Sequence, residues 1–236
     1  MTDLFNKLDF SAISKQLLYD PASPLLFNTG LFLLLFVGFM GIYELLRNHR
    51  RTRMVLTILF SLYFYYKSSA EYSYILLGIC LSDYIMGRLL GATSRNWLRK
   101  SIVFLNIALN LGMLIYFKYF NLLLSSWAQF SGGKFDALDI ILPAGISFIT
   151  FRSISYIVDV YRRDMEPEKN LLNYTFSLTF FPPLLAGPVV RAKDMLPQVR
   201  ENRAATQQMI SEGLFLIMIG LVKKVIIADY ISGNFV

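Results

Sequence analysis

Phe180–Gln198 reads FFPPLLAGPVVRAKDMLPQ and overlaps the end of an uncharged run of twenty residues, 171–190. A run of that length can span the hydrocarbon core of a bilayer as an α-helix. It contains the pair Pro182-Pro183 and also Pro188, and each proline removes a backbone donor and obstructs the preceding helical turn. Charged residues follow at once, beginning with Arg191. The stretch therefore predicts an apolar segment that does not continue as one regular helix.

The composition of the chain is that of a membrane protein. Hydrophobic residues make up 55% of the sequence, charged residues 17%, and the mean hydropathy is +0.49. Soluble domains average roughly 45–50% apolar and about 25% charged residues. We predict an all-α, polytopic integral membrane protein with about six or seven membrane helices plus a re-entrant segment. Residues 24–236 would form one membrane domain, and residues 1–23 either an interfacial helix or a frayed terminus.

Apolar blocks alternate with short polar loops along the chain. The expected spans are Leu25–Leu46, Met54–Tyr66, Tyr72–Leu90, Ser101–Trp127, Ile140–Val158 and Met209–Ile231. Two aromatic-rich stretches, Leu62–Lys67 and Tyr116–Phe120, are expected at the membrane–water interface, where tyrosine is enriched.

The positive charges predict an orientation. The net charge is +7, and the dense basic loops are Arg47–Arg53, Arg95–Lys100 and the pair Arg162-Arg163. Basic residues placed between apolar blocks favour cytoplasmic loops next to a lipid bilayer over a nucleic-acid partner. If the N-terminus lies outside, all three loops fall in the cytoplasm. We therefore expect a multi-pass protein of the inner or plasma membrane.

The same rule bears on the segment that contains the prolines. If residues 171–190 crossed the membrane, Arg191, Lys193 and Arg200 would lie outside, against the rule. A segment that enters and returns keeps them in the cytoplasm. Irregular backbone at membrane depth is tolerated only where protein or a water-filled cavity covers it, so a re-entrant path would indicate a cavity. A continuous but kinked helix is the alternative.

Familiar catalytic and metal-binding patterns are missing from the sequence. There is no GxxxxGK[ST], HExxH or GxSxG motif. His49 is the sole histidine and Cys80 the sole cysteine, so neither a histidine cluster nor an internal disulfide can form. We expect no bound metal or cofactor.

One apolar span carries a polar stripe. At helical spacing, Phe148, Arg152, Ser155 and Asp159 share a face of the helix expected over Ile140–Val158. A charge at bilayer depth costs about 3 kcal/mol or more, so it usually faces the protein interior or water. The stripe would line a cavity, or Arg152 would form a structural ion pair with Asp159 or with an acidic residue of another helix.

Leu142–Gln198 contains an LP-x-G-ISF-x-TF stretch, a Y-x-x-D-x-YR stretch, FFP-x-x-x-x-GP and a basic RxxDxLPQ tail. Here these are Leu142, Pro143, Gly145–Phe148, Thr150, Phe151, Tyr156, Asp159, Tyr161, Arg162, Phe180–Pro182, Gly187, Pro188, Arg191, Asp194 and Leu196–Gln198. With this set of motifs, the segment resembles the membrane-bound O-acyltransferase family, in the branch of the bacterial alginate O-acetyltransferases. The departures are Arg152, where glutamine is usual, and Met195, where phenylalanine is usual.

The resemblance implies a helical fold around a funnel, entered by an acyl donor from one side and an acceptor hydroxyl from the other. It also implies a histidine acting as general base in a helix beyond the RxxDxLPQ tail. This chain would then be the N-terminal part of the domain, with no catalytic residue of its own and no activity alone. The candidate cavity residues are Phe148, Arg152, Ser155, Asp159, Pro182, Gly187, Pro188, Arg191 and Asp194.

The implied reaction is acetyl transfer to hydroxyls of a cell-surface polysaccharide. Acetyl-CoA would be a donor substrate, and an acyl-transfer partner would act on the periplasmic or extracellular side. Two other functions stay open at this point. One is a non-enzymatic membrane scaffold that keeps the fold, and the other is a transporter, which the broken segment and Arg152 would also suit.

Overall fold

The computed structural model describes residues 16–20, 24–133, 136–185, 187–201 and 205–235. Within these ranges the regular structure is entirely helical, which confirms the predicted all-α class. Most of the predicted N-terminal segment, residues 1–23, lies outside the described residues.

Helices of very different lengths follow one another along the chain. The longer ones are α3 (Gly30–Leu45), α4 (Arg50–Ser69), α5 (Ser73–Ala92), α6 (Asn96–Leu114), α8 (Ile146–Arg162) and α11 (Gln207–Val222). The shorter ones are α7 (Phe120–Ser131), α9 (Leu171–Thr179), α10 (Ala192–Arg200) and α12 (Asp229–Phe235). A 3-10 turn at Ala70–Tyr72 joins α4 to α5, and π-helical segments at Ile115–Tyr119 and Lys223–Ala228 join α6 to α7 and α11 to α12.

Short polar side chains mark several helix ends. The Thr29 hydroxyl accepts a hydrogen bond from the Phe32 N–H at the start of α3, and Asn170 Oδ1 accepts one from Leu172 at the start of α9. Thr206 does the same for Met209 at the start of α11. These are the residue types that satisfy the free N–H groups of a first helical turn. At Gly132, which follows α7, φ is +69°, as is common one residue past a helix end.

Two helical stretches are long and apolar enough to cross a membrane by length and composition. They are Arg50–Ala92, which includes both α4 and α5, and Asn96–Ser131. Helix α3 is apolar but shorter. These findings are consistent with a membrane protein, while the predicted number of six or seven spans stays a prediction.

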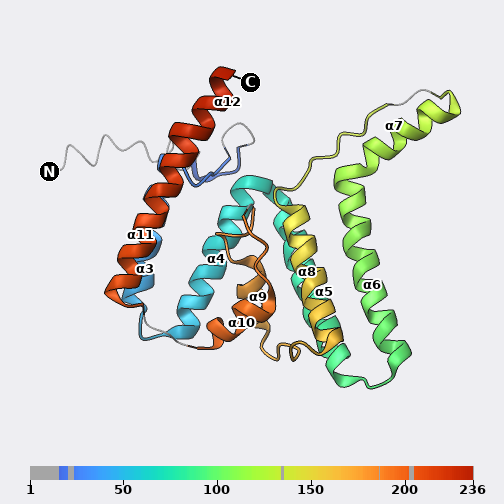
Figure 1. Ribbon diagram of the computed structural model, residues 1–236, viewed down its shortest axis with the longest axis horizontal. Helices are drawn as coiled ribbons and strands as arrows, with labels where there is room; N and C mark the ends of the chain where they lie inside the picture. The colour runs from blue at the N-terminus through green and yellow to red at the C-terminus, as the bar shows by residue number, and fades with distance from the viewer. Residues whose placement is uncertain (1–15, 21–23, 134–135, 186, 202–204, 236) are drawn as a thin grey trace.

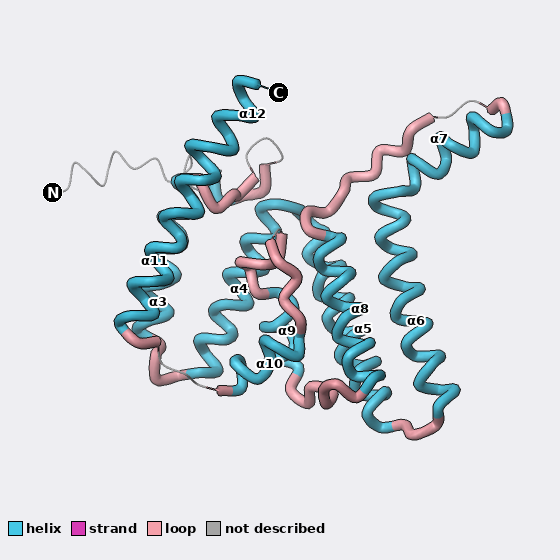
Figure 2. Tube along the Cα trace, in the orientation of Figure 1, coloured by secondary structure: helices cyan, strands magenta, loops and turns pink. Residues whose placement is uncertain are grey.

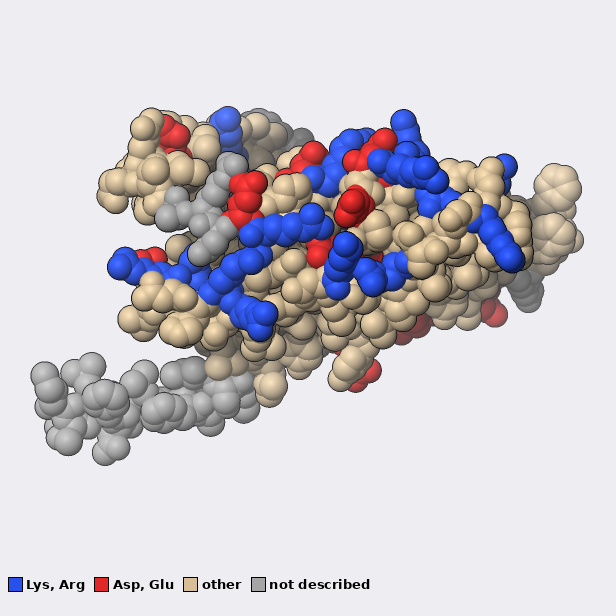
Figure 3. Space-filling model, turned by 90° about the horizontal axis from the view of Figure 1, so that it is seen from below, with Lys and Arg blue, Asp and Glu red and all other residues tan. Residues whose placement is uncertain are grey.

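The helices run up and down between two ends of the molecule (Figure 1, Figure 2). The connections 46–49, 93–95 and 163–170 lie at one end, and the connections 70–72 and 136–145 lie at the other. Figure 3 views the first end and shows that lysine and arginine side chains gather on it, so we call it the basic end. The basic loops that the charge pattern grouped together thus share one end of the fold.

Apolar side chains from α4, α5, α8 and α9 meet in the main core. Its buried members are Tyr65, Leu76, Ile79, Cys80, Leu90, Ile149, Tyr156, Ile157, Val160, Tyr174, Leu178, Leu184 and Leu196. Leu184 belongs to the turn after α9 and Leu196 to α10, so both ends of the proline-rich stretch are held by this core.

A second cluster is mainly aromatic and joins α3 and α4 to the same turn. Phe181 lies among the rings of Phe32, Phe60 and Phe64, with centroid distances of 6.3, 5.1 and 6.0 Å. Such ring pairs stabilise a fold beyond the area they bury. Phe64 and its neighbour Tyr65 are fully buried. The expectation of an interfacial belt at Leu62–Lys67 is therefore wrong for these two rings, because burial against a partner helix is not visible in one stretch of sequence.

A buried carboxylate fixes the loop 163–170 at the basic end. Glu168 Oε1 accepts hydrogen bonds from the backbone N–H groups of Lys169 and Asn170, at 3.0 and 2.9 Å. Its Oε2 accepts two from the Arg200 guanidinium, from Nε at 3.0 Å and from Nη2 at 2.6 Å. The Glu168 N–H in turn donates to the Tyr156 hydroxyl of α8. The loop, α8 and α10 are thus joined at one side chain.

A bend at the opposite end depends on a glycine. Gly145 precedes α8 with φ of +70°, and a Cβ atom built on it would lie 2.6 Å from the Leu184 carbonyl oxygen and 3.0 Å from the Leu185 Cα. Only glycine adopts this backbone conformation without cost and allows the close approach. The LPAGISF and FFPPLLAGP stretches therefore contact each other directly, backbone against backbone.

We predict that Gly145→Ala destabilises the fold by about 1–3 kcal/mol or more, because it adds left-handed strain and a clash with Leu184. The midpoint of thermal unfolding of the purified protein in detergent measures this. Gly78→Ala is the matched control, since Gly78 lies within α5 with open space around it. There alanine should stabilise by about 0.5–1 kcal/mol. Equal midpoints for the two variants would contradict the contact.

We predict that the contribution of Glu168 to stability is lost in acid. Burial by itself would raise the pKa of this carboxyl, but the bonds from Asn170 and Arg200 outweigh it and hold the pKa below its ordinary value of 4.5. A lowered folded-state pKa stabilises above the ordinary pKa and ceases to do so as the pH falls through the lowered one. Glu168→Gln should therefore lower the unfolding midpoint at neutral pH, and the difference from wild type should shrink below about pH 4.5.

Thermal unfolding across this pH range checks the prediction. Glu166→Gln, at an exposed position of the same loop, is the control and should change the midpoint little at any pH. A difference between Glu168→Gln and wild type that persists unchanged in acid would refute the prediction.

Candidate functional site

The proline-rich segment enters the fold and turns back. Helix α9 leaves the basic end and stops at Thr179, the chain reverses over residues 180–191, and α10 lies again at the basic end (Figure 1). The stop follows from Pro182-Pro183, because a proline cannot supply the N–H of a continuing helix. The chain reverses as the re-entrant prediction requires and does not form a single kinked helix, while its placement in a membrane stays a prediction.

Arg152 closes the broken end of α9. Its side chain reaches from α8, is 5% exposed, and donates a hydrogen bond from Nη2 to the carbonyl of Ser177. The carbonyls of the last helical turn lack intrahelical partners, so an interior helix end needs donors from elsewhere. Arg152 supplies one. Its Nη1 is buried and has no hydrogen-bond partner in the described part of the chain.

The other residues of the predicted stripe lie on α8 at different depths. Asp159 is buried, and its Oδ2 lacks a partner within the described ranges, whereas Phe148 and Ser155 are half-buried. No ion pair joins Arg152 to Asp159 or to another described acidic residue. The partner of Arg152 is a backbone carbonyl, which a search for opposite charges in the sequence does not consider.

The predicted residues after α9 are on the surface. Pro182, Gly187, Pro188, Arg191 and Asp194 are exposed. Gly187 has a φ of +124°, Arg191 precedes α10, and Asp194 lies in its first turn, where a negative charge suits the helix dipole. The structure therefore does not gather the nine predicted site residues into one cluster.

The turning segment separates two cavities. An apolar cavity of about 650 Å³ lies between α3, α4, the turn and α11. Its lining includes Phe27, Phe32, Phe36, Phe64, Phe181, Pro182, Leu185, Ile217 and Leu221, with Asn28 and Lys224 as polar members. Pro182 is the predicted site residue that borders it. An apolar cavity with a few polar groups at its edge is the usual form of a site for a small organic group.

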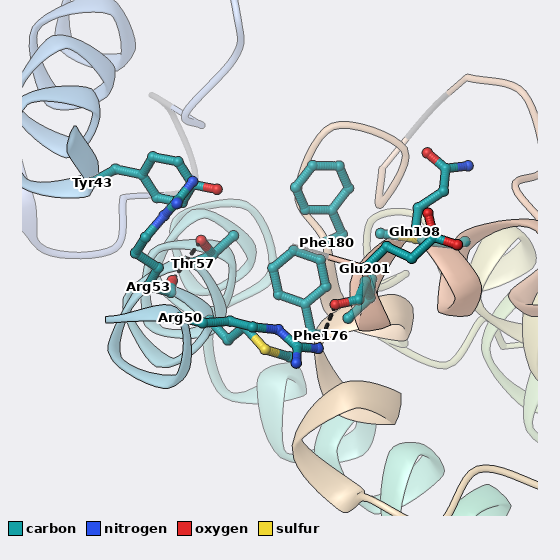
Figure 4. Close-up of a pocket in the computed structure, with 11 residues that line it drawn as sticks. Tyr43, Arg50, Arg53, Thr57, Phe176, Phe180, Gln198 and Glu201 are labelled. Carbon is teal, nitrogen blue, oxygen red and sulfur yellow. Dashed lines mark hydrogen bonds between the residues drawn. The ribbon is translucent and has the colours of Figure 1, made fainter. Parts of the chain in front are cut away.

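The second cavity, of about 270 Å³, lies at the basic end and is shown in Figure 4. It is bounded by α3, α4, α9 and α10, and we call it the basic pocket. Its lining residues are Tyr43, Arg50, Arg53, Met54, Thr57, Phe176, Phe180, Met195, Gln198, Val199 and Glu201. The consecutive residues Phe180 and Phe181 thus border different cavities.

A buried acid connects four helices at the centre of the bundle. Asp83 of α5 is fully buried and accepts hydrogen bonds from Asn106 Nδ2 and Ser153 Oγ at 2.7 Å each, and from the Tyr174 hydroxyl at 2.9 Å. Asn106 lies on α6, Ser153 on α8 and Tyr174 on α9. These partners were not predicted from the sequence, because the prediction considered charged side chains and these three carry no charge. An asparagine in the middle of a long apolar span was the available signal.

Among the described residues, no group of histidine, cysteine, aspartate and glutamate side chains is arranged to hold a metal ion. His49, the sole histidine of the sequence, precedes α4 at the basic end, is exposed, and lines neither cavity. The described residues therefore line these cavities without a histidine, and the interior holds an arginine and a buried acid.

We predict that Arg152→Leu destabilises the protein by about 1–3 kcal/mol, because the Ser177 carbonyl loses its donor. Arg152→Gln keeps an N–H donor and should lose half of that or less. Thermal unfolding in detergent measures both, with Arg88→Leu, an exposed arginine of α5, as control. If the glutamine variant were as unstable as the leucine variant, the charge of Arg152 and not its hydrogen bond would be the stabilising feature.

Comparison with known proteins gives relatives along most of the chain. The probable alginate O-acetylases of Pseudomonas putida and Pseudomonas aeruginosa are each 36% identical, over 219 and 214 residues. These matches cover 88% of this chain and 44% and 41% of the relatives. The peptidoglycan O-acetyltransferase of Helicobacter pylori is 31% identical over 236 residues, which cover 87% of this chain and 45% of that protein.

The chain thus spans less than half the length of the curated relatives it matches. No family model matches it, and no solved structure is significantly similar to it. The matches nevertheless extend well beyond the motifs of residues 142–198. On these relationships the chain belongs to the membrane-bound O-acyltransferase family, in the branch of the alginate O-acetylases.

Proposed function

We propose that this chain is part of an enzyme that transfers acetyl groups to hydroxyls of a cell-surface polysaccharide. The observation that carries the proposal is the identity of 31–36% to proteins named alginate O-acetylase and peptidoglycan O-acetyltransferase. Both names describe the same reaction on two different polymers. An alginate-like polymer, peptidoglycan or another hydroxyl-bearing glycan is accordingly the acceptor class.

The two cavities support a reaction with substrates from opposite sides. The basic pocket opens at the end where lysine and arginine gather, and the apolar cavity lies on the other side of the turn at Phe180-Phe181. We place the basic end in the cytoplasm by the positive-inside rule and the N-terminus outside, in the inner or plasma membrane. The donor, acetyl-CoA, would approach from the cytoplasm as a substrate rather than a bound cofactor. The polysaccharide, with an acyl-transfer partner, would lie outside.

Acetyl transfer needs a base, and the sole histidine of this chain lines neither cavity. As the acceptor hydroxyl attacks the acetyl carbonyl, an ester C–O bond forms, the thioester C–S bond of the donor breaks, and the hydroxyl proton must be taken up and passed to the leaving thiolate. His49 is exposed at the basic end and lines neither cavity. We therefore propose that the base comes from a part of the enzyme outside these 236 residues. The role of the described residues is to position substrates and exclude water.

Removal of the coding sequence from its host tests the function. Acetate released by mild alkali from the isolated cell-surface polysaccharides should fall, and re-expression should restore it. Re-expression of Gly145→Ala should restore less, because the turn between the cavities is displaced. Unchanged acetate after deletion would overturn the proposal and favour a scaffold without enzymatic function.

A second measurement tests the missing base. The purified chain of 236 residues in lipid nanodiscs, given labelled acetyl-CoA and a soluble polysaccharide acceptor, should form no labelled ester above background. Labelled ester that disappears in a heat-denatured control would show that the chain is active alone.

A further inference from the structure

The basic pocket has the chemistry of an anion site and lies apart from the apolar cavity. Two arginines of α4, Arg50 and Arg53, are spaced by three residues and so face the same side of the helix. Figure 4 shows Tyr43 and Arg53 on one side of the opening and Phe176, Phe180 and Gln198 on the other. Glu201 is the one acidic residue among the described lining. The arginines therefore leave the lining with a positive balance.

Arg53 is held in place, but not all of its N–H donors have an acceptor. Its guanidinium lies over the Tyr43 ring, 3.9 Å from the centroid. Nη1 donates a long hydrogen bond of 3.4 Å to the Arg47 carbonyl. Nε is buried and has no partner among the residues that the structure describes. A buried donor without an acceptor is costly.

Arg50 fixes the opposite rim of the same opening. Its Nη2 donates to the Val199 carbonyl of α10 at 2.5 Å, which joins the start of α4 to the end of the turning segment. This bond holds the guanidinium against α10, beside Phe176 in Figure 4. Two guanidinium groups held by a ring and by a backbone carbonyl lose little conformational freedom when an anion binds.

The rest of the lining selects among anions. Met54, Phe176, Phe180 and Met195 give the pocket an apolar wall beside the arginines. A small hydrated anion gains nothing from such a wall, whereas a phosphate ester with an organic part can place its charge on the guanidinium groups and its carbon atoms on the rings. The planar donor pairs of arginine also match phosphate oxygens better than they match chloride.

We propose that the basic pocket binds the phosphate group of an organic phosphate ester, with Arg53 as its main ligand and Arg50 as the second. The source of the phosphate is either the headgroup of an anionic phospholipid or a soluble phosphate ester. Binding here does not depend on acetyl transfer, so failure of this proposal leaves the proposed function untouched, and the reverse also holds.

Two binding assays on the purified chain distinguish the sources. In the lipid arm, nanodiscs of mixed phosphatidylglycerol and phosphatidylcholine are used, and retained phosphatidylglycerol is counted by native mass spectrometry. In the soluble arm, the shift in unfolding midpoint is followed against added glycerol 3-phosphate at constant ionic strength. Arg53→Gln should weaken whichever binding occurs by about tenfold or more, since a charged hydrogen bond is lost.

Arg51→Gln is the matched control, because Arg51 has the same charge and lies in the same turn of α4 but is exposed and does not line the pocket. Arg53→Lys keeps the charge without the planar donors and should bind more weakly than wild type. It also provides a second variant if Arg53→Gln does not fold, which helical circular dichroism would report.

The outcomes assign the source or overturn the proposal. Loss confined to Arg53→Gln in the lipid arm assigns a phospholipid headgroup, and loss confined to that variant in the soluble arm assigns a soluble ester. Equal weakening by Arg51→Gln and Arg53→Gln means diffuse attraction to a basic surface and overturns the site. Absence of binding in both arms overturns it as well, as does full binding by Arg53→Lys and Arg53→Gln alike.

Discussion

A helix that ends inside an apolar bundle leaves carbonyl groups that water cannot reach, and the architecture around α9 follows from that constraint. Water is scarce there, so donors must come from neighbouring helices. The Arg152 guanidinium reaches the Ser177 carbonyl from α8. The turn that follows is held by Phe181 among the rings of α3 and α4 and by its contact with Gly145. Helices that are distant in sequence thus pack around the point where α9 ends.

The same interior contains a second polar group with a different task. Asp83 accepts three hydrogen bonds from uncharged side chains on three other helices. A buried carboxylate with several donors needs no opposite charge, and its directional bonds fix the positions of the helices that donate them. Arg152 closes an end of the backbone, whereas Asp83 sets the relative placement of whole helices. Neither group borders the apolar cavity or the basic pocket.

Predictions from the sequence were most accurate where they rested on composition and charge. The apolar blocks predicted the all-α class, and the break at Pro182-Pro183 together with the basic residues beyond it predicted a segment that turns back. Side-chain contacts were predicted less well, because they depend on which helices become neighbours. Phe64 was expected at an interface but is buried, and the role of Asn106 depends on a carboxylate 23 positions away. The stripe through Arg152 has the predicted spacing, yet its partner is a backbone atom, which residue types do not reveal.

The Asp83 cluster also has a consequence for the order of synthesis. Tyr174 is made 91 residues after Asp83, and Ser153 70 residues after it. At about 5–20 residues per second, the ribosome needs roughly 5–20 s to deliver the last of these donors. During that interval Asn106, which follows after 23 residues, is the first of them to be made. Asparagine on the next helix therefore gives the newly made carboxylate its earliest partner of the final set, before the bundle that buries it is complete.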